Sequence, residues 1–240
     1  MARPNGVVIV SERFWAFAAQ DGGLRHGAMP RAAHAPRAIP LVRGLLSIAA
    51  SLSPLFRAGG VAGPKERALL ATGLLVPFGF VFLPGTLGTV VALALTAMLL
   101  GILFRGRTLA LHGAEHRAIA AAEERRLEET WHGQALPSRL SWRCGTNFAA
   151  LALPVSTGVE LLWPLPIAPY TPFVLTVLSL AVTMEFWQAV QASSHAAARF
   201  PLLPGIGLQR ITTREPELDE TRLALTALAS VLQRELALRA

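Results

Sequence analysis

Two long stretches of this chain carry very little charge, and they limit its fold more than any other feature. They cover residues 67–104 and 147–199, and each is divided by a proline-containing turn, at Pro84 and at Pro164. Each arm approaches the roughly 20 apolar residues that a helix needs to cross a bilayer. Only 15% of all residues are charged, whereas soluble domains have about 25%. We therefore predict a mainly α-helical, polytopic membrane protein with about four transmembrane helices in two hairpins.

More polar segments surround these hairpins. Two short apolar runs before the turn Asp21-Gly22-Gly23 are typical of a β-hairpin. Helical periodicity predicts an amphipathic helix in the membrane interface after Pro40 and two further helices at 109–127 and 219–239, whereas residues 201–216 are predicted to form a loop. The predicted parts are an N-terminal cytoplasmic segment at 1–39, the interfacial helix at 40–58, the first hairpin at 67–104, a cytoplasmic loop with the middle helix at 105–146, the second hairpin at 147–199, and a cytoplasmic loop with the amphipathic C-terminal helix at 200–240.

Arginine is concentrated outside the hairpins, and the chain has a net charge of +7. The turns at Pro84 and Pro164 carry no charge, while the segments before, between and after the hairpins are rich in arginine. Because positively charged loops stay on the cytoplasmic side, we expect both termini in the cytoplasm and the hairpins in the inner (cytoplasmic) membrane. The low charge fraction favours membrane lipids over nucleic acid as the partner of these arginines.

The helix predicted after the first hairpin contains the sequence HGAEH, with His112, Glu115 and His116. Residues four apart lie on the same face of a helix, so both imidazoles can bind one divalent metal such as zinc. H-x-x-E-H is also the inverzincin signature, and Glu115 is then the candidate general base that activates a water. The alternative is a polar helix face at the membrane surface without a metal.

A metal centre needs a third ligand, and the candidates are Cys144, Glu185, His195 and His132. Cys144 follows Arg143 where the second hairpin begins, and a thiol at a helix N-terminus has a lowered pKa. Glu185 lies within a predicted span, where an unpartnered carboxylate costs several kcal/mol and indicates a functional site. The alternatives are a cysteine that only fills space and a carboxylate paired with an arginine for structural reasons.

The segment before the last helix combines hydroxyl, amide and guanidinium groups that suit a phosphate or a lipid headgroup. The candidate contacts are His195, Gln209, Thr212, Thr213 and Arg214. The alternative is a capping turn whose arginines touch the membrane surface.

Three motifs occur in order between the hydrophobic stretches: HGAEH at 112–116, RCGT at 143–146, and Gln209 with the Thr-Thr pair and the proline that follow it. In this order they resemble the YqhQ-like family of bacterial membrane proteins (domain of unknown function 1385). The resemblance covers residues 37–233 and implies a membrane protein with a metal-dependent site, but no settled reaction. The chain resembles a divergent member, because Trp142 replaces a histidine usual in the family and the glycine- and methionine-rich opening segment is shortened.

Two functions from different classes are compatible with these features. The first is a metal-dependent membrane hydrolase with its site at the cytoplasmic face, in which Cys144 or Glu185 completes a site begun by the two histidines of HGAEH. The second is a non-catalytic scaffold, assembly factor or accessory subunit that binds other membrane-protein subunits. Trp142 favours the second function, since the replaced histidine could be a ligand in the family.

Overall fold

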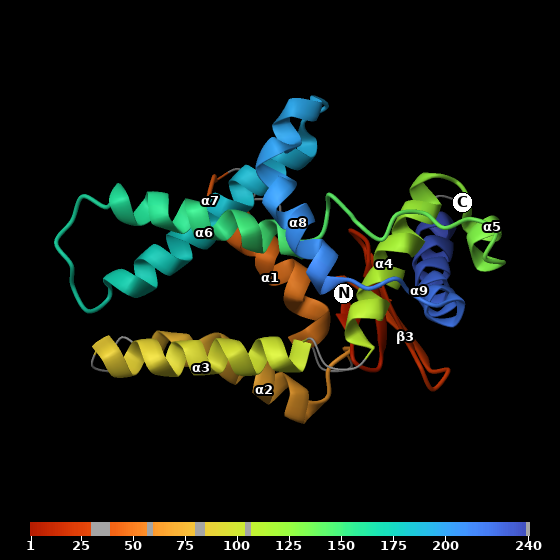
Figure 1. The fold of residues 1–240 in the computed structure, drawn as a ribbon, viewed down its shortest axis with the longest axis horizontal. Helices are drawn as coiled ribbons and strands as arrows, with labels where there is room; N and C mark the ends of the chain where they lie inside the picture. Colours follow the sequence, from red (N-terminus) through yellow and green to blue (C-terminus); the bar gives the residue numbers. More distant parts are fainter. Residues whose placement is uncertain (30–38, 57–59, 80–84, 104–106, 239–240) are drawn as a thin grey trace. The chain divides into compact units, whose positions relative to one another are not determined.

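The structure is a computed structural model that describes residues 1–29, 39–56, 60–79, 85–103 and 107–238 (Figure 1). The chain folds into two compact units, each assembled from separate segments. Unit 1 consists of Met1–Arg31, Phe104–Asn147 and Leu202–Ala240, and unit 2 consists of Ala32–Leu103 and Phe148–Pro201.

Unit 1 begins with an antiparallel sheet whose four strands follow one another in the order β1-β2-β3-β4. The hairpin predicted from the sequence corresponds to β2 and β3, which pair directly. β4 follows a turn in which Gly22 has a φ of +85°, a conformation that only glycine adopts readily. The hairpin is thus confirmed and extended by a strand on each side. The strands are β1 (Ala2–Arg3), β2 (Gly6–Val10), β3 (Phe14–Ala19) and β4 (Leu24–Ala28).

Two helices of unit 1, α4 (Thr108–Glu123) and α9 (Leu218–Ala237), pack against each other and against one face of the sheet (Figure 1). Alternate residues of β2 and β3 point to this face, as the two-residue period of a strand requires. The small alanines of α4 allow close packing. The buried cluster consists of Val7, Ile9, Ala16, Ala18, Leu111, Ala114, Ala118, Ala121, Ala224, Leu225, Ala227, Leu228 and Val231.

The middle helix ends earlier than predicted, because Arg125 adopts a left-handed conformation with a φ of +59°. The N–H of Arg126 donates to the carbonyl of Ala121 at 2.8 Å, and the N–H of Arg125 donates to that of Ala122 at 3.2 Å. This pair of bonds is a Schellman motif, which closes a helix C-terminus. The short helix α5 (Leu127–Trp131) follows directly.

The predicted loop at 201–216 is wrong, because this segment contains helix α8 (Leu203–Thr212). Prolines and glycines favoured a loop, yet proline is well tolerated in the first turn of a helix. Gly205 has a tertiary role, since a Cβ there would lie 2.5 Å from Cα of Asn147.

Unit 2 is helical in its described part. α1 packs closely against α7, since a Cβ on Gly44 would lie 3.0 Å from the carbonyl oxygen of Ala181. The location of α1 in a membrane interface stays a prediction. α7 ends at Ala192, because Ser193 is extended with a ψ of 132°. The helices are α1 (Val42–Phe56), α2 (Pro64–Gly79), α3 (Gly85–Leu103), α6 (Gly145–Leu161, which begins in unit 1), α7 (Thr171–Ala192) and the 3-10 helix η3 (Ala196–Leu202).

One helix among the described residues, α7, is both long and apolar enough to cross a membrane. α2 and α6 have 16 and 17 residues, which is shorter than the roughly 20 residues that a spanning helix needs. The chain is therefore mostly helical with a small N-terminal sheet, as expected, while four membrane-crossing helices stay a prediction. The predicted turn at Pro84 falls partly outside the described residues.

Candidate metal centre

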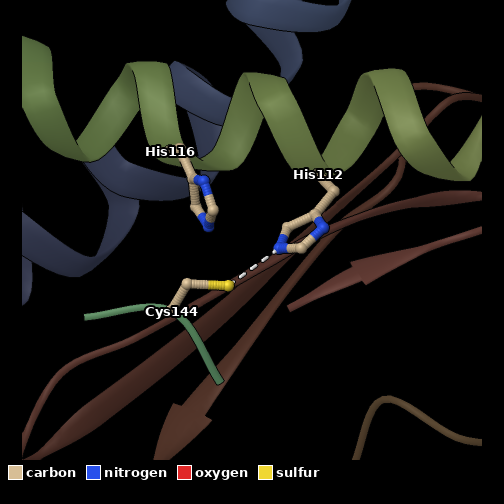
Figure 2. Close-up of side chains that lie close together, drawn as sticks. All are labelled: His112, His116 and Cys144. Atoms are coloured by element: carbon tan, nitrogen blue, oxygen red, sulfur yellow. Dashed lines mark hydrogen bonds between the residues drawn. The ribbon is translucent and has the colours of Figure 1, made fainter. Parts of the chain in front are cut away.

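His112 and His116 lie on the face of α4 that points away from the core of unit 1. Leu111, Ala114 and Ala118 occupy the core face, and a rotation of about 100° per residue places both histidines on the opposite side. Their ring centroids are 4.5 Å apart in an edge-to-face arrangement. Figure 2 shows both rings projecting from the helix toward Cys144.

A glycine between the histidines lets another segment cross α4 at close range. A Cβ on Gly113 would collide with the carbonyl oxygen of Arg214 and lie 3.3 Å from Cδ of Pro216. The N–H of Arg214 donates to the carbonyl of Leu109 at 2.9 Å. The segment that follows α8 is thereby held against the histidine face.

Backbone carbonyls fix the orientation of both histidine rings. Nδ1 of His112 lies 2.9 Å from the carbonyl oxygen of Thr212, and Nδ1 of His116 lies 2.7 Å from that of Arg139. Because a carbonyl oxygen only accepts hydrogen bonds, both Nδ1 atoms carry a hydrogen. Nε2 is then the atom available to a metal, as in most metal-ligating histidines.

Cys144 lies directly before the first residue of α6. Its Sγ is 3.3 Å from Nε2 of His112, 3.3 Å from Oγ1 of Thr146 and 3.4 Å from the backbone nitrogen of Thr146. A helix N-terminus carries a partial positive charge that favours an anion. This environment therefore stabilises the thiolate.

The pKa values of Cys144 and His112 shift in opposite directions. Burial raises the pKa of the Cys144 thiol, but hydrogen bonds with His112 and His116 and the charge of both rings lower it by more, to about 5. Burial lowers the pKa of His112, but its hydrogen bond with Cys144 and the charges of Cys144 and Glu115 raise it by more, above its ordinary value. The thiolate is the form of cysteine that binds metals and attacks electrophiles.

The geometry of these three residues fits a divalent metal. One donor atom from each of His112, His116 and Cys144 lies within 4.8 Å of the other two. Donor atoms around a tetrahedral zinc are about 3.3–3.8 Å apart, and the 3.3 Å between Nε2 of His112 and Sγ of Cys144 already has this value. Two imidazoles and a thiolate suit zinc and leave one coordination position for water or substrate.

The two carboxylates singled out in the sequence do not join this cluster. Glu115 contacts the amine of Met1. Glu185 lies on α7 in unit 2, where it forms an ion pair with Arg43 and accepts a hydrogen bond from the N–H of Leu41 at 3.0 Å. This pairing is the structural alternative considered for Glu185. His195 and His132 are exposed and outside the cluster.

The residues predicted to contact a lipid headgroup differ in their exposure. Gln209 has no exposed surface, and its amide bonds to Ser141 and Asn147, so a lipid headgroup contact does not fit this residue. Thr213 is also buried, and its hydroxyl donates to the carbonyl of Gln209 at 2.7 Å. For His195, Thr212 and Arg214 this contact stays a prediction.

The sequence analysis did not identify two arginines that bond to the segments around the site. Arg117 is buried; it donates to the carbonyl of Pro137 at 3.1 Å and forms an ion pair with Glu215. Arg139 supplies the carbonyl that orients His116, and its guanidinium donates to the carbonyl of Thr213 at 2.8 Å. Arg117 follows the HGAEH motif directly, and this adjacency is the one signal that could have marked it.

Comparison with known proteins gives a family for this chain. A profile of the family described as "Protein of unknown function (DUF1385)" matches residues 79–234. The chain belongs to this family. It is 28% identical over 138 residues to the uncharacterized protein YqhQ of Bacillus subtilis (strain 168), which covers 54% of the chain and 42% of YqhQ, so the match spans less than half the length of this relative. No solved structure matches the chain.

The match to the DUF1385 profile includes α4, Cys144 and α8. The resemblance inferred from the three sequence motifs is thereby confirmed. The family description names no activity.

Proposed function

We propose that this DUF1385 member is a metal-dependent hydrolase of the bacterial inner membrane with its site at the cytoplasmic face. One observation carries the proposal: His112 and His116 each donate Nδ1–H to a backbone carbonyl and so direct Nε2 toward the Cys144 thiolate. Catalytic zinc sites have three protein ligands and one open position, whereas structural zinc sites have four. A lipid or a membrane peptide is the proposed substrate class.

The residues around the site have separable roles in this proposal. His112, His116 and Cys144 would hold a divalent metal, and such an ion would lower the pKa of a bound water to about 7, as in zinc enzymes. The carbonyls of Thr212 and Arg139 hold the histidine rings, and the N–H and hydroxyl of Thr146 stabilise the charge on Cys144. Glu115 is the candidate general base: it contacts the amine of Met1 rather than the three donors, and its charge raises the pKa of His112.

The division of the chain into units supports two transmembrane hairpins. The chain leaves unit 1 twice, for Ala32–Leu103 and for Phe148–Pro201. If unit 1 stays on one side of the membrane, each of these two segments, here called an excursion, crosses the membrane an even number of times. The second excursion contains α6 and α7, and the first contains α1, α2 and α3. α1 is the shortest of these, with 15 residues and an internal proline, so α2 and α3 are the proposed crossing pair.

The charge distribution supports the orientation of this arrangement. The arginine-rich segments belong mostly to unit 1, and positive segments stay in the cytoplasm. We therefore place unit 1, both termini and the metal centre on the cytoplasmic side, with α1 in the interface.

A second candidate function is a non-catalytic subunit or assembly factor that binds other membrane-protein subunits. It is favoured by burial, since His116 and Cys144 are only 3% and 8% exposed. Structural metal sites are closed, whereas catalytic sites must admit substrate. Trp142 in place of the histidine usual in the family points the same way.

Metal analysis of the purified protein tests the site that both candidates share. We expect roughly one zinc per chain in the wild type, as three-ligand sites hold a single ion. The double variant His112→Ala/His116→Ala and the variant Cys144→Ser should lose it. The matched control is His132→Ala, which removes an exposed histidine outside the cluster. Equal and negligible metal in wild type and variants would overturn the proposal.

Hydrolysis assays separate the two candidates. Metal-loaded protein in vesicles is given a fluorogenic phospholipid ester and a fluorogenic membrane peptide. Glu115→Gln should keep the metal and lose about 10²–10⁴-fold in rate, the usual contribution of a general base. Metal-loaded wild type that cleaves neither substrate would reject the hydrolase and leave the non-catalytic subunit.

A further inference from the structure

The turn that carries Cys144 is held by two buried amide side chains. Residues 141–144 lie just before α6 and have no regular secondary structure beyond this turn. The N–H of Cys144 lies 3.4 Å from the carbonyl oxygen of Ser141, which closes the turn. Any displacement of Ser141 therefore moves the thiol.

Gln209 on α8 pairs with the backbone of Ser141 through both ends of its amide. Its Oε1 accepts from the N–H of Ser141 at 2.8 Å, and its Nε2 donates to the carbonyl of Ser141 at 2.8 Å and to Oδ1 of Asn147 at 2.8 Å. The side chain is fully buried. Both donors and the acceptor of the amide are used, as a buried polar group requires.

Asn147 completes the same network from the first turn of α6. Its Nδ2 donates to the carbonyls of Ser141 at 3.0 Å and Trp142 at 2.9 Å. It is also fully buried and lies directly against Gly205 of α8, where a Cβ would collide with Oδ1 and Cα of Asn147. We name Gln209 and Asn147 the amide clamp.

We infer that the amide clamp positions the Cys144 thiolate against His112 and His116. The inference rests on the proposed metal centre and names the residues that assemble it. Helix α8 reaches two of the three donors: Gln209 holds the cysteine turn, and the carbonyl of Thr212 holds the ring of His112. One helix thus sets the distance between the sulfur and a histidine nitrogen.

Loss of the clamp should weaken metal binding while the ligands themselves remain. Groups that orient metal ligands typically contribute 10- to 100-fold to metal affinity. We expect a loss of this size for Gln209→Leu, which removes every hydrogen bond from the amide of Gln209.

A matched pair of glycine variants on α8 tests the same contact without replacing either amide side chain. Gly205→Ala pushes a methyl group into Asn147, whereas Gly207→Ala meets no atom within 4 Å. Both changes raise helix propensity by the same amount. We expect Gly205→Ala to reproduce the effect of Gln209→Leu and Gly207→Ala to behave as wild type.

The readouts are cobalt binding and the reactivity of Cys144. Cobalt(II) is titrated into the metal-free protein, and the near-ultraviolet thiolate-to-cobalt band reports the Cys144–metal bond. The two clamp variants, Gln209→Leu and Gly205→Ala, should bind cobalt 10- to 100-fold more weakly and lose this band. Maleimide labelling of the single cysteine, measured without metal above the ordinary thiol pKa of about 8.5, should be at least tenfold faster in them.

The outcomes distinguish the amide clamp from the metal centre. Leu228→Ala, a substitution in the core cluster of unit 1, controls for general destabilisation and should keep the band and the slow labelling. Wild-type affinity and labelling in both clamp variants would overturn the inference. A wild type without any cobalt band, but with faster labelling in the clamp variants alone, would reject the metal centre and retain the clamp as the device that positions the thiol.

Discussion

The Cys144 thiol of the metal-free protein should ionise far below the usual pH. Its pKa falls to about 5 in the folded protein, whereas an ordinary thiol has a pKa of about 8.5. At 1.36 kcal/mol per pKa unit, this difference is on the order of 5 kcal/mol in favour of the thiolate. The thiolate is buried, so it depends on its partners, and His112 is the first among them at 3.3 Å. His112→Gln should raise the pKa of Cys144 well above 5, because burial then acts against the hydrogen bond and charge of His116 alone.

Thiolate absorbance and the rate of iodoacetamide alkylation measure this ionisation against pH. The chain has a single cysteine, so both signals belong to Cys144. His132→Gln is the control, since its ring is exposed and outside the cluster. A wild-type midpoint near 8.5, or an unchanged midpoint in His112→Gln, would refute the reasoning.

The same shift predicts how stability depends on pH, and the sign follows from the direction of each pKa. The folded pKa of Cys144 lies below its unfolded value, so its contribution is complete above about pH 8.5 and is lost as the pH falls through about 5. The raised pKa of His112 acts oppositely: its contribution is complete below about pH 6.5 and is lost as the pH rises through the folded pKa. Between about pH 6.5 and 5 only the Cys144 contribution changes. In that window the thermal unfolding midpoint should fall with pH in wild type and less in Cys144→Ser.

Three further substitutions test packing and helix ends in unit 1 by thermal unfolding. Gly113→Ala should destabilise by about 1–3 kcal/mol despite its better helix propensity, because the new methyl group collides with the backbone of Arg214; an unchanged midpoint would contradict this contact. Arg125→Gly should stabilise by about 1 kcal/mol, because it relieves a left-handed residue at the end of α4; a lower midpoint would count against the strain. Glu220→Ala should cost about 1–2 kcal/mol, because it removes the bond to the N–H of Glu217 that caps α9 and the ion pair with Arg107; a midpoint equal to wild type would show that the cap contributes nothing.

Local patterns in the sequence were sufficient for part of the fold and part of the site. Helical spacing fixes the neighbourhood of His112 and His116, since residues four apart share a helix face. Alternating apolar residues next to a glycine turn fix β2 and β3. The pKa of a thiol at a helix N-terminus could also be anticipated for Cys144.

The third donor could not be chosen from the sequence, because residue type alone left four candidates, namely Cys144, Glu185, His195 and His132. Glu185 is excluded as a ligand because it forms an ion pair with Arg43, which lies 142 residues earlier in the chain. α8 was missed for a related reason. Glycine favours loops by propensity, but at position 205 glycine is needed because Asn147 approaches closely. No local sequence pattern indicates this contact.

Gln209 shows the same limit for function. An amide beside two hydroxyls and an arginine suggests a ligand contact when only residue types are known. Its complete burial and its pairing with Ser141 give it a structural task. Whether a polar side chain faces outward or inward depends on tertiary packing, and the sequence contains no periodic signal for it in so short a helix.

The interrupted path of unit 1 has a consequence for the synthesis of the protein. Its sheet is translated first, α4 follows one excursion later, and α8 and α9 emerge last. The apolar face of the nascent sheet therefore remains without α9 until both excursions have left the ribosome. Contacts between segments so distant in sequence form slowly. Cys144 and His112 also wait for α8 to align them. At the proposed metal centre, zinc loading would then report that the chain has been synthesised at least through α8.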